Sequence, residues 1–268
     1  MHNKYILVSD VETIEKRFSA KTPKGQTEIP KSYAVECGDD TYIITEPNFV
    51  QVFRYGMTPY YSSEPLNLTS ARTEGTKNGN DDPNYNGSKA IFLQPEFKKS
   101  IFSQRCIVVA DAFYTMSDKC QPFVVYLQGK CRPFGFAGVY DSWQNPETKE
   151  IINGFAIITT TANQMLQGIG VKRMPVILPF QYESTWLKPT LHLSEILRFL
   201  VPYPPTKMNA YPVGDIVNGS WVNDPSMIEP AGEKLQDETV PVSRVRSHYP
   251  HKSKPTSSLP YFKITETE

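Results

Sequence analysis

Residues 105–139, RCIVVADAFYTMSDKCQPFVVYLQGKCRPFGFAGV, decide the fold class of this 268-residue chain. Segments 106–110, 123–127 and 134–139 are rich in β-branched and aromatic residues, which favour β-strands. The same signals predict further strands outside this stretch, at residues 5–8, 41–45, 51–55 and 154–159. Because several of these strands follow one another without a segment of helical length between them, we expect antiparallel pairing rather than helical crossovers.

Short helices are predicted around these strands. Ser9 and Glu12 have the Ser-x-x-Glu spacing of a helix-capping box, and the apolar residues that follow are spaced for one buried helix face. Further helices are expected at residues 95–102, 162–167, 183–187 and 193–200. The sequence therefore predicts a single α+β domain, built on a curved antiparallel sheet or open β-barrel with short flanking helices.

Composition and charge narrow the classes of partner. The chain has 28 Lys and Arg against 28 Asp and Glu, so any site for nucleic acid or another charged partner must be local. Its four cysteines lack CxxC spacing, and with four His there is no zinc pattern, so we expect no metal and no cofactor. Because no signal peptide or membrane-length apolar run is present, we expect a cytoplasmic protein, nucleoid-associated if bacterial, with no membrane partner.

Two regions are expected to lie outside the core. Residues 74–89, EGTKNGNDDPNYNGSK, are so rich in Asn, Gly and Asp that we expect a long flexible loop. Residues 236–268 carry no acid between Pro241 and Leu259 and are rich in Pro and Ser, which predicts a mobile basic tail. Such a tail is usually only solvated, with phosphate contact as the alternative. The domain itself is expected to span residues 1–235.

Seven segments occur in the order found in one known family. They are FRYGMTP (53–59), SARTE (70–74), RCIVVADAFY (105–114), GFAGVYDSW (135–143), FAIITTTAN (155–163), RMPVIL (173–178) and VNDPSMIEP (222–230). Together they resemble the SRAP family, the SOS-response-associated peptidase domain, over roughly residues 1 to 230. The resemblance implies a compact barrel-like α+β domain, with a basic groove leading to a pocket, that senses abasic sites in single-stranded DNA.

The resemblance also implies a chemistry at the N-terminus. In the family Met1 is removed, and a Cys at position 2 reacts with the aldehyde of the ring-opened sugar. The α-amine forms an imine, and the thiol closes a five-membered thiazolidine that resists hydrolysis. An α-amine suits this step because its pKa of about 7.7–8.0 leaves a neutral fraction near pH 7. A Glu and a His would transfer the protons.

This sequence departs from the family pattern at each reactive position. His2 stands where the family has Cys, Thr115 where it has Glu, and Gly170 and Val171 where it has His. A Thr hydroxyl does not titrate near neutral pH, and Gly and Val carry no proton. His2 could act as a general base or bind phosphate when protonated, or it could simply be an exposed histidine. We therefore assign no catalytic residue.

The groups that the resemblance assigns to DNA phosphates are largely retained. Arg72 and Arg173 stand at phosphate-facing positions, and Lys4 replaces an Arg of the family with its charge kept. Phosphate contact needs only a correctly placed cation, so these residues could still hold a strand. Ser70 replaces an Asn and weakens one polar contact. The alternative for each arginine is an internal salt bridge, which for Arg72 would involve Glu74 or Asp111.

Tyr60 and Tyr61 stand where the family often has aromatic residues that stack on bases beside the lesion. Stacking of this kind is tolerant of sequence. The alternative is an ordinary half-buried aromatic pair. Asp111 and Asp141 end strands and are expected to cap or turn the chain rather than to catalyse.

Three functions follow from these residues. The leading one is a catalytically degenerate SRAP-family domain, a monomer that binds single-stranded or abasic-site DNA without a covalent bond. The second is an active member that forms a DNA–protein crosslink at its N-terminus or acts as a self-peptidase. The third is a protein-interaction module that has lost DNA binding. Salt separates the first from the third, because phosphate contacts weaken steeply with ionic strength.

Overall fold

The computed structural model describes residues 4–26, 28–129, 132–214 and 223–238 of the chain. His2, for which the sequence left a role open, and the part of the predicted tail from residue 239 onwards lie outside these ranges. Among the described residues, no helix is both long and apolar enough to cross a membrane.

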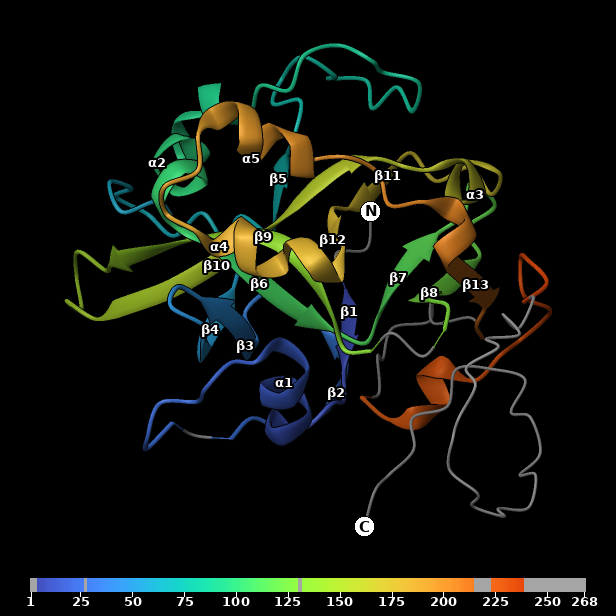
Figure 1. The fold of residues 1–268 in the computed structure, drawn as a ribbon, viewed down its shortest axis with the longest axis horizontal. Helices are drawn as coiled ribbons and strands as arrows, with labels where there is room; N and C mark the ends of the chain where they lie inside the picture. Colours follow the sequence, from blue (N-terminus) through green and yellow to red (C-terminus); the bar gives the residue numbers. More distant parts are fainter. Residues whose placement is uncertain (1–3, 27, 130–131, 215–222, 239–268) are drawn as a thin grey trace, which may run out of the picture.

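A closed five-stranded barrel forms one half of the fold (Figure 1). Its strands pair in a ring whose last member returns to the first: β10 (Ile151–Thr161), β4 (Phe49–Tyr55), β3 (Asp40–Thr45), β6 (Arg105–Ala110) and β9 (Phe134–Gln144). Three short strands extend the ring: β5 (Ser70–Arg72), β11 (Arg173–Pro175) and β12 (Ile177–Leu178). The α+β class and the barrel are therefore confirmed, and the barrel is closed rather than open.

Pairing in the barrel is mixed. Most strands pair antiparallel, as expected, but β10 runs parallel to β4 and to β5. The expectation of purely antiparallel pairing was wrong at these two places. The reason is that β10 is the strand that closes the ring, and its neighbours there come from distant parts of the chain rather than from adjacent hairpins.

A second, five-stranded sheet lies beside the barrel (Figure 1). Its order is β13 (Met208–Pro212), β8 (Pro122–Leu127), β7 (Ala112–Met116), β1 (Tyr5–Leu7) and β2 (Ser32–Val35). The chain passes from β6 in the barrel to β7 in this sheet at Asp111, whose buried carboxylate accepts the amides of Val8 and Ser9 at 2.8 Å. Asp111 therefore ties the start of the chain to the junction of the two sheets, as a capping residue.

Five α-helices and four short 3₁₀ helices connect the strands in the described part of the chain. The α-helices are α1 (Val11–Phe18), α2 (Pro95–Ser103), α3 (Gln164–Gln167), α4 (Glu183–Leu187) and α5 (Leu193–Phe199). The 3₁₀ helices span Ile91–Leu93, Phe180–Tyr182, Pro205–Lys207 and Pro225–Ile228. The expected helices are confirmed, and most of their ends lie within two residues of the expected ones.

The cap of α1 differs from the expectation. Asp10, not Ser9, is the N-cap, and its carboxylate accepts the amide of Thr13 at 2.8 Å. Ser9 instead donates its hydroxyl to Asp111 at 2.6 Å. The tertiary contact has taken the hydroxyl, so the capping position moves one residue along the chain.

Arg105 fastens two helices to the barrel. Its buried guanidinium donates to the carbonyls of Ile101 and Phe102 at the end of α2, at 2.8 and 2.7 Å, and to those of Trp186 and Lys188 at the end of α4. These helix-end carbonyls lack partners within their own helices. One cation therefore satisfies four acceptors and fixes α2 and α4 against β6.

The described chain continues as ordered structure slightly past the expected domain end at residue 235. The amide of Gln236 donates to Asn209 on β13 at 3.1 Å, and Glu238 accepts the hydroxyl of Tyr126 on β8. Residues 236–238 are therefore packed on the second sheet.

Candidate functional site

β10 brings the two predicted phosphate-binding arginines to one edge of the barrel. Arg72 ends β5, which runs parallel to β10 with Arg72 opposite Thr159. Arg173 begins β11, which runs antiparallel to β10 with Arg173 opposite Thr161. Since β5 and β11 lie on the two sides of β10, the arginines approach each other from segments about a hundred residues apart in sequence.

Arg173 is almost fully buried, with a side chain that is 7% exposed. Its Nη2 donates to the Glu74 carboxylate at 3.0 Å and to the carbonyl and hydroxyl of Thr159 at 2.9 and 3.1 Å. Its Nη1 donates to Asp81 at 3.2 Å. Its Nε is buried and has no hydrogen-bond partner among the described residues. Arg173 is thus a structural cation that still has one donor to offer.

Arg72 is much more accessible, with a side chain that is 40% exposed. Its Nη2 donates to the second oxygen of Asp81 at 3.1 Å, and its Nη1 lies 3.5 Å from the carbonyl of Asn78. Asp81 therefore bridges the two guanidinium groups, one with each carboxylate oxygen. We call the four residues Arg72, Arg173, Glu74 and Asp81 the arginine cluster.

Both arginines take part in internal salt bridges, the alternative that sequence left open. The partner of Arg72 is Asp81, however, and neither Glu74 nor Asp111. Sequence reasoning missed Asp81 because it lies in a segment taken only as a loop. The one signal was the acidic pair Asp81-Asp82 nine residues after Arg72, which does not specify a partner.

Residues 74–89 form a series of turns that lie over β5 and α5, the teal segment at the top of Figure 1. Asn78 is buried and braces the turn, since its amide group exchanges hydrogen bonds with Asp82 at 2.8 and 3.0 Å. Asp81 itself has a left-handed backbone, with φ 51°, a conformation that Asp tolerates better than most residues. Gln167 at the end of α3 donates to the carbonyl of Pro83 at 3.2 Å.

A small pocket of about 20 Å³ lies beside Thr159. Its lining combines aromatic, aliphatic and hydroxyl side chains with one cation: Lys4, Tyr5, Tyr55, Thr69, Ser70, Phe113, Tyr114, Phe136, Ile157, Thr159 and Pro175. Thr159 joins the pocket to the arginine cluster, because it lines the first and accepts Arg173 in the second. Lys4 and Ser70, two of the predicted DNA-binding residues, are therefore next to the arginines.

The tyrosine hydroxyls of this pocket stay protonated near neutral pH. Burial raises the pKa of the Tyr5, Tyr55 and Tyr114 hydroxyls above their ordinary value, so these groups stay neutral. Lys4 forms an ion pair with the exposed Glu36. No carboxylate, imidazole or thiol is among the described residues that line the pocket.

Two of the three positions that the family resemblance assigns to reactive residues lie within the described residues. Thr115 is buried on β7, opposite Phe123 of β8, and Val171 is buried in the main hydrophobic core. Gly170 has φ +79°, and a Cβ there would lie 2.4 Å from Cβ of Asp118. A side chain at position 170 would therefore collide with the β7–β8 turn, whereas position 171 already carries one.

Tyr60 and Tyr61 are exposed, at 57% and 53%, rather than half-buried. Their rings meet edge to face with centroids 5.5 Å apart, and Nζ of Lys99 lies 4.2 Å from the Tyr60 centroid. The backbone under them is anchored, since the amide of Tyr60 donates to the buried Asp141 at 3.0 Å. Asp141 is thus a structural acceptor, as expected, and the two rings face solvent.

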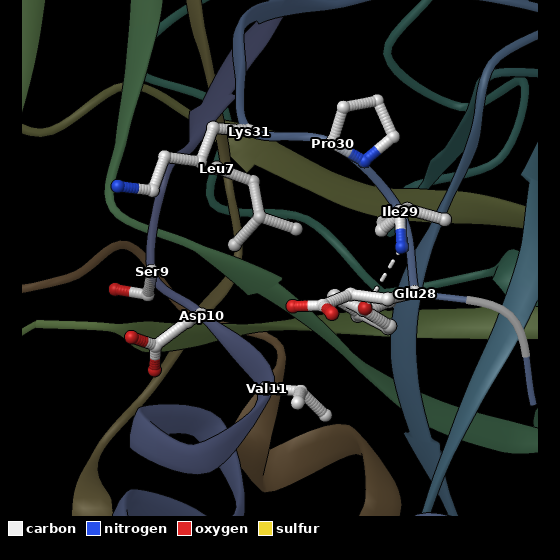
Figure 2. Close-up of a pocket in the computed structure, with 9 residues that line it drawn as sticks. Leu7, Ser9, Asp10, Val11, Glu28, Ile29, Pro30 and Lys31 are labelled. Atoms are coloured by element: carbon white, nitrogen blue, oxygen red, sulfur yellow. Dashed lines mark hydrogen bonds between the residues drawn. The ribbon is translucent and has the colours of Figure 1, made fainter.

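Larger hollows lie elsewhere on the molecule. One of about 440 Å³ lies at the start of α1 (Figure 2). Helix α1 is at the bottom of Figure 1, whereas the 74–89 loop is at the top. Figure 2 shows Ser9 and Asp10 on one side of this hollow and Glu28 and Ile29 on the other. Asp10, Ser9 and Tyr42 already bond within the protein, to Thr13, Asp111 and Ile29 respectively. Another, of about 450 Å³, is lined mainly by apolar residues of 177–204.

Metal ligands do not cluster in the part of the chain that the structure describes: no three His, Cys, Asp or Glu side chains come together there in a way that could hold an ion. The described cysteines are Cys37, Cys106 and Cys120, and all three are free thiols. Burial raises the pKa of the Cys106 thiol, which keeps it protonated and unreactive.

Known proteins are similar to this chain in sequence. The family described as SRAP, SOS response associated peptidase, matches residues 1–220. The chain is 28% identical to the abasic site processing protein YoqW of Bacillus subtilis (strain 168), over 85% of this chain and 99% of that protein. It is 27% identical to the abasic site processing protein HMCES of Rattus norvegicus, over 56% of this chain and 50% of that protein.

A solved structure is also similar. The crystal structure of a protein from Bacteroides thetaiotaomicron matches with a TM-score of 0.72 and 28% identity, over 85% of this chain and 99% of that one. The family match over residues 1–220 covers the barrel, the second sheet and both arginines. This chain belongs to the SRAP family.

Proposed function

We propose that this chain takes part in the DNA-damage response by binding abasic sites in single-stranded DNA, and that it does so without a covalent bond. The observation that carries the proposal is the arginine cluster, where two guanidinium groups from distant segments meet around one carboxylate. Two guanidinium groups at this spacing suit the two free oxygens of a phosphodiester. The names of the relatives, which are abasic site processing proteins, support the lesion as the target.

The path of the strand follows from the groups at the cluster and the pocket beside it. Arg72, which is 40% exposed, and Lys4 would bind phosphates beside the small pocket, and Ser70 would offer a hydroxyl there. The exposed rings of Tyr60 and Tyr61 would stack on neighbouring bases. All of these groups come from one chain, so we propose that the protein acts as a monomer in the cytoplasm.

The absence of a covalent step is proposed from the residues at the reactive positions. Thr115 and Val171 cannot transfer protons, and the sequence has His2 in place of a thiol at position 2. An imine formed by an N-terminal amine alone would stay reversible, because no thiol adds to the imine carbon to close a thiazolidine ring. The described residues that line the pocket offer hydroxyls and one ammonium group, which can bind sugar or phosphate oxygens, and they include no carboxylate, imidazole or thiol.

Fluorescence anisotropy with labelled single-stranded oligonucleotides, intact or with one abasic site, tests the binding. The decisive variant is R72Q, and R54Q is its matched control, because Arg54 is also ion-paired and 41% exposed but lies away from the cluster. We expect R72Q to weaken binding by about tenfold and R54Q to leave it unchanged. If three cations contact phosphates, log Kd should change with log salt by roughly 2 per unit.

Equal binding by R72Q, R54Q and the unaltered protein would contradict the proposal. A salt-independent affinity would do the same, since it would remove phosphate contact as the source of binding.

A further inference from the structure

The Asp81 carboxylate links the two arginines of the cluster. Its Oδ1 accepts Arg173 at 3.2 Å and its Oδ2 accepts Arg72 at 3.1 Å. The two oxygens of this one carboxylate each accept a hydrogen bond from a different guanidinium group. The two free oxygens of a phosphodiester would make the same pair of contacts. Asp81 therefore bridges the two arginines, one with each carboxylate oxygen.

Charge in the cluster is balanced only while Asp81 is present. The cations are Arg72 and Arg173, and the anions are Glu74 and Asp81, so two positive and two negative charges cancel. Without Asp81 the same cluster carries one net positive charge. A phosphate that approaches the closed cluster thus meets a neutral site and a carboxylate, which repels it.

The two acids hold the cluster in different ways. Glu74, the first residue of the loop, is buried beside β5 with a side chain 4% exposed, and it pairs with Arg173 at 3.0 Å. Asp81 is 26% exposed and lies at the tip of a turn in the 74–89 loop. The contacts that hold this turn are mostly polar and local, such as those between Asn78 and Asp82. Segments of this kind open more readily than packed strands.

The buried Nε of Arg173 is a further feature of the arginine cluster. It has no hydrogen-bond partner among the described residues, although buried donors are rarely left unpaired. Asp81 therefore covers the guanidinium pair without using all of its donors. A ligand with more acceptor oxygens than a carboxylate could use this donor as well.

From these contacts we propose that residues 78–85 form an acidic strap, in which Asp81 occupies the phosphate site of the arginine cluster until a DNA phosphate displaces it. The strap is autoinhibitory: it weakens binding of any phosphate and opens when a strand engages both arginines. This inference rests on the proposed function for its ligand, but it concerns a step that DNA binding alone does not require.

Asp81 and its neighbour Asp82 give a matched pair of variants. D81N removes the charge that faces the arginines, whereas D82N removes an equal charge from the same turn that pairs with neither arginine. We expect D81N to bind the single-stranded oligonucleotide about tenfold more tightly than the unaltered protein, and D82N to bind within about twofold of it. Thermal unfolding of both variants should stay close to that of the unaltered protein, since Asp81 is partly exposed.

A second measurement uses the unaltered chain, so it does not depend on a variant that folds. Amide hydrogen exchange of residues 78–85 should speed up when the oligonucleotide binds, because the strap is released. A merely structural role for Asp81 predicts slower or unchanged exchange there. Equal oligonucleotide affinities for all three proteins, together with unchanged exchange, would overturn the strap and leave the proposed function standing.

Failure of DNA binding in all three proteins would refute the proposed function, and inorganic pyrophosphate then decides on the strap. Calorimetric titration should show pyrophosphate binding to D81N but not to the unaltered protein or D82N, with the site lost in the double variant D81N/R72Q. No pyrophosphate binding to D81N would overturn the strap as well.

Discussion

The arginine cluster and the pocket next to it share Thr159, yet they have different chemical character. In the cluster every side chain is charged, and four ionic groups pair within a few ångströms. In the pocket the lining is mostly aromatic and aliphatic, and Lys4 is the one charged side chain among the described residues that line it. A charged region and a largely apolar region thus lie next to each other at one edge of the barrel, and our proposal of binding without reaction assigns the phosphate contacts to the charged one.

The cluster itself shows why retention of a residue need not mean function. Arg173 is bonded to Glu74 and Thr159 in the barrel wall, so the fold needs it with or without DNA. Arg72 is 40% exposed and bonds only to the 74–89 loop among the described residues, so the fold has less use for it. Arg72 is therefore the better indicator of binding.

Restoring the reactive groups should break the comparison most strongly. We expect the triple variant H2C/T115E/V171H to form a heat-stable adduct with abasic single-stranded DNA, visible on a denaturing gel, where the unaltered chain forms none. Position 171 is chosen over 170 because a side chain at Gly170 would collide with Asp118. The double variant T115E/V171H, which lacks the thiol, is the control.

An adduct-free triple variant that is folded and binds DNA would mean that the pocket differs from the family in more than these side chains. Because Thr115 and Val171 are buried, folding must be checked by circular dichroism before the gel is interpreted.

Loss of Arg173 should separate its structural role from that of Arg72. R173M leaves the buried Glu74 without its main partner, and we expect it to lower the free energy of unfolding by about 3–5 kcal/mol. R72M removes a partly exposed pair and should cost about 1 kcal/mol or less. Urea denaturation of both variants measures the difference, and equal losses would show that the two arginines are not distinct in role.

The exposed tyrosines should contribute affinity but not stability. We expect Y60A and Y61A each to weaken binding of single-stranded DNA by about 1–3 kcal/mol if its ring stacks on a base. F180A is a suitable control, since Phe180 is also exposed, at 68%, but lies on the helical face near α4. Unchanged anisotropy titrations for both tyrosine variants would place the strand elsewhere.

Lys4 should give the smallest effect. Its side chain already pairs with Glu36, so phosphate contact replaces one ionic partner by another. We expect K4Q to reduce the slope of log Kd against log salt by roughly 0.7, with only a few-fold loss of affinity. A slope equal to that of the unaltered protein would remove Lys4 from the interface.

Many of the strands and helices could be predicted because they depend on residue patterns within short stretches of sequence. The strands at 106–110, 123–127 and 134–139 are apolar runs, and β6, β8 and β9 contain them. The short β5 was not predicted, since Ser-Ala-Arg has no strand pattern and is a strand only because β10 pairs with it. The parallel pairing of β10 and the loss of Ser9 as a cap likewise depend on contacts between distant residues.

The site could be predicted only in part, because it also depends on contacts between distant residues. Family resemblance placed Arg72, Arg173 and Ser70 in one region, and the structure brings them together around Thr159. It did not indicate Asp81, because a loop rich in Asn, Gly and Asp fixes no partner by its sequence. Which acid reaches which arginine is decided by how the turn folds back on β10, and the sequence pattern does not contain that information.

The most direct test of binding without reaction is one incubation analysed on two gels. The purified protein is mixed with a labelled single-stranded oligonucleotide that contains one abasic site, beside an intact control, and run on native and denaturing gels together. We expect a shifted band on the native gel and none on the denaturing gel after heating. A heat-stable adduct on the denaturing gel would contradict the account and direct the search for the attached residue to Met1 and His2.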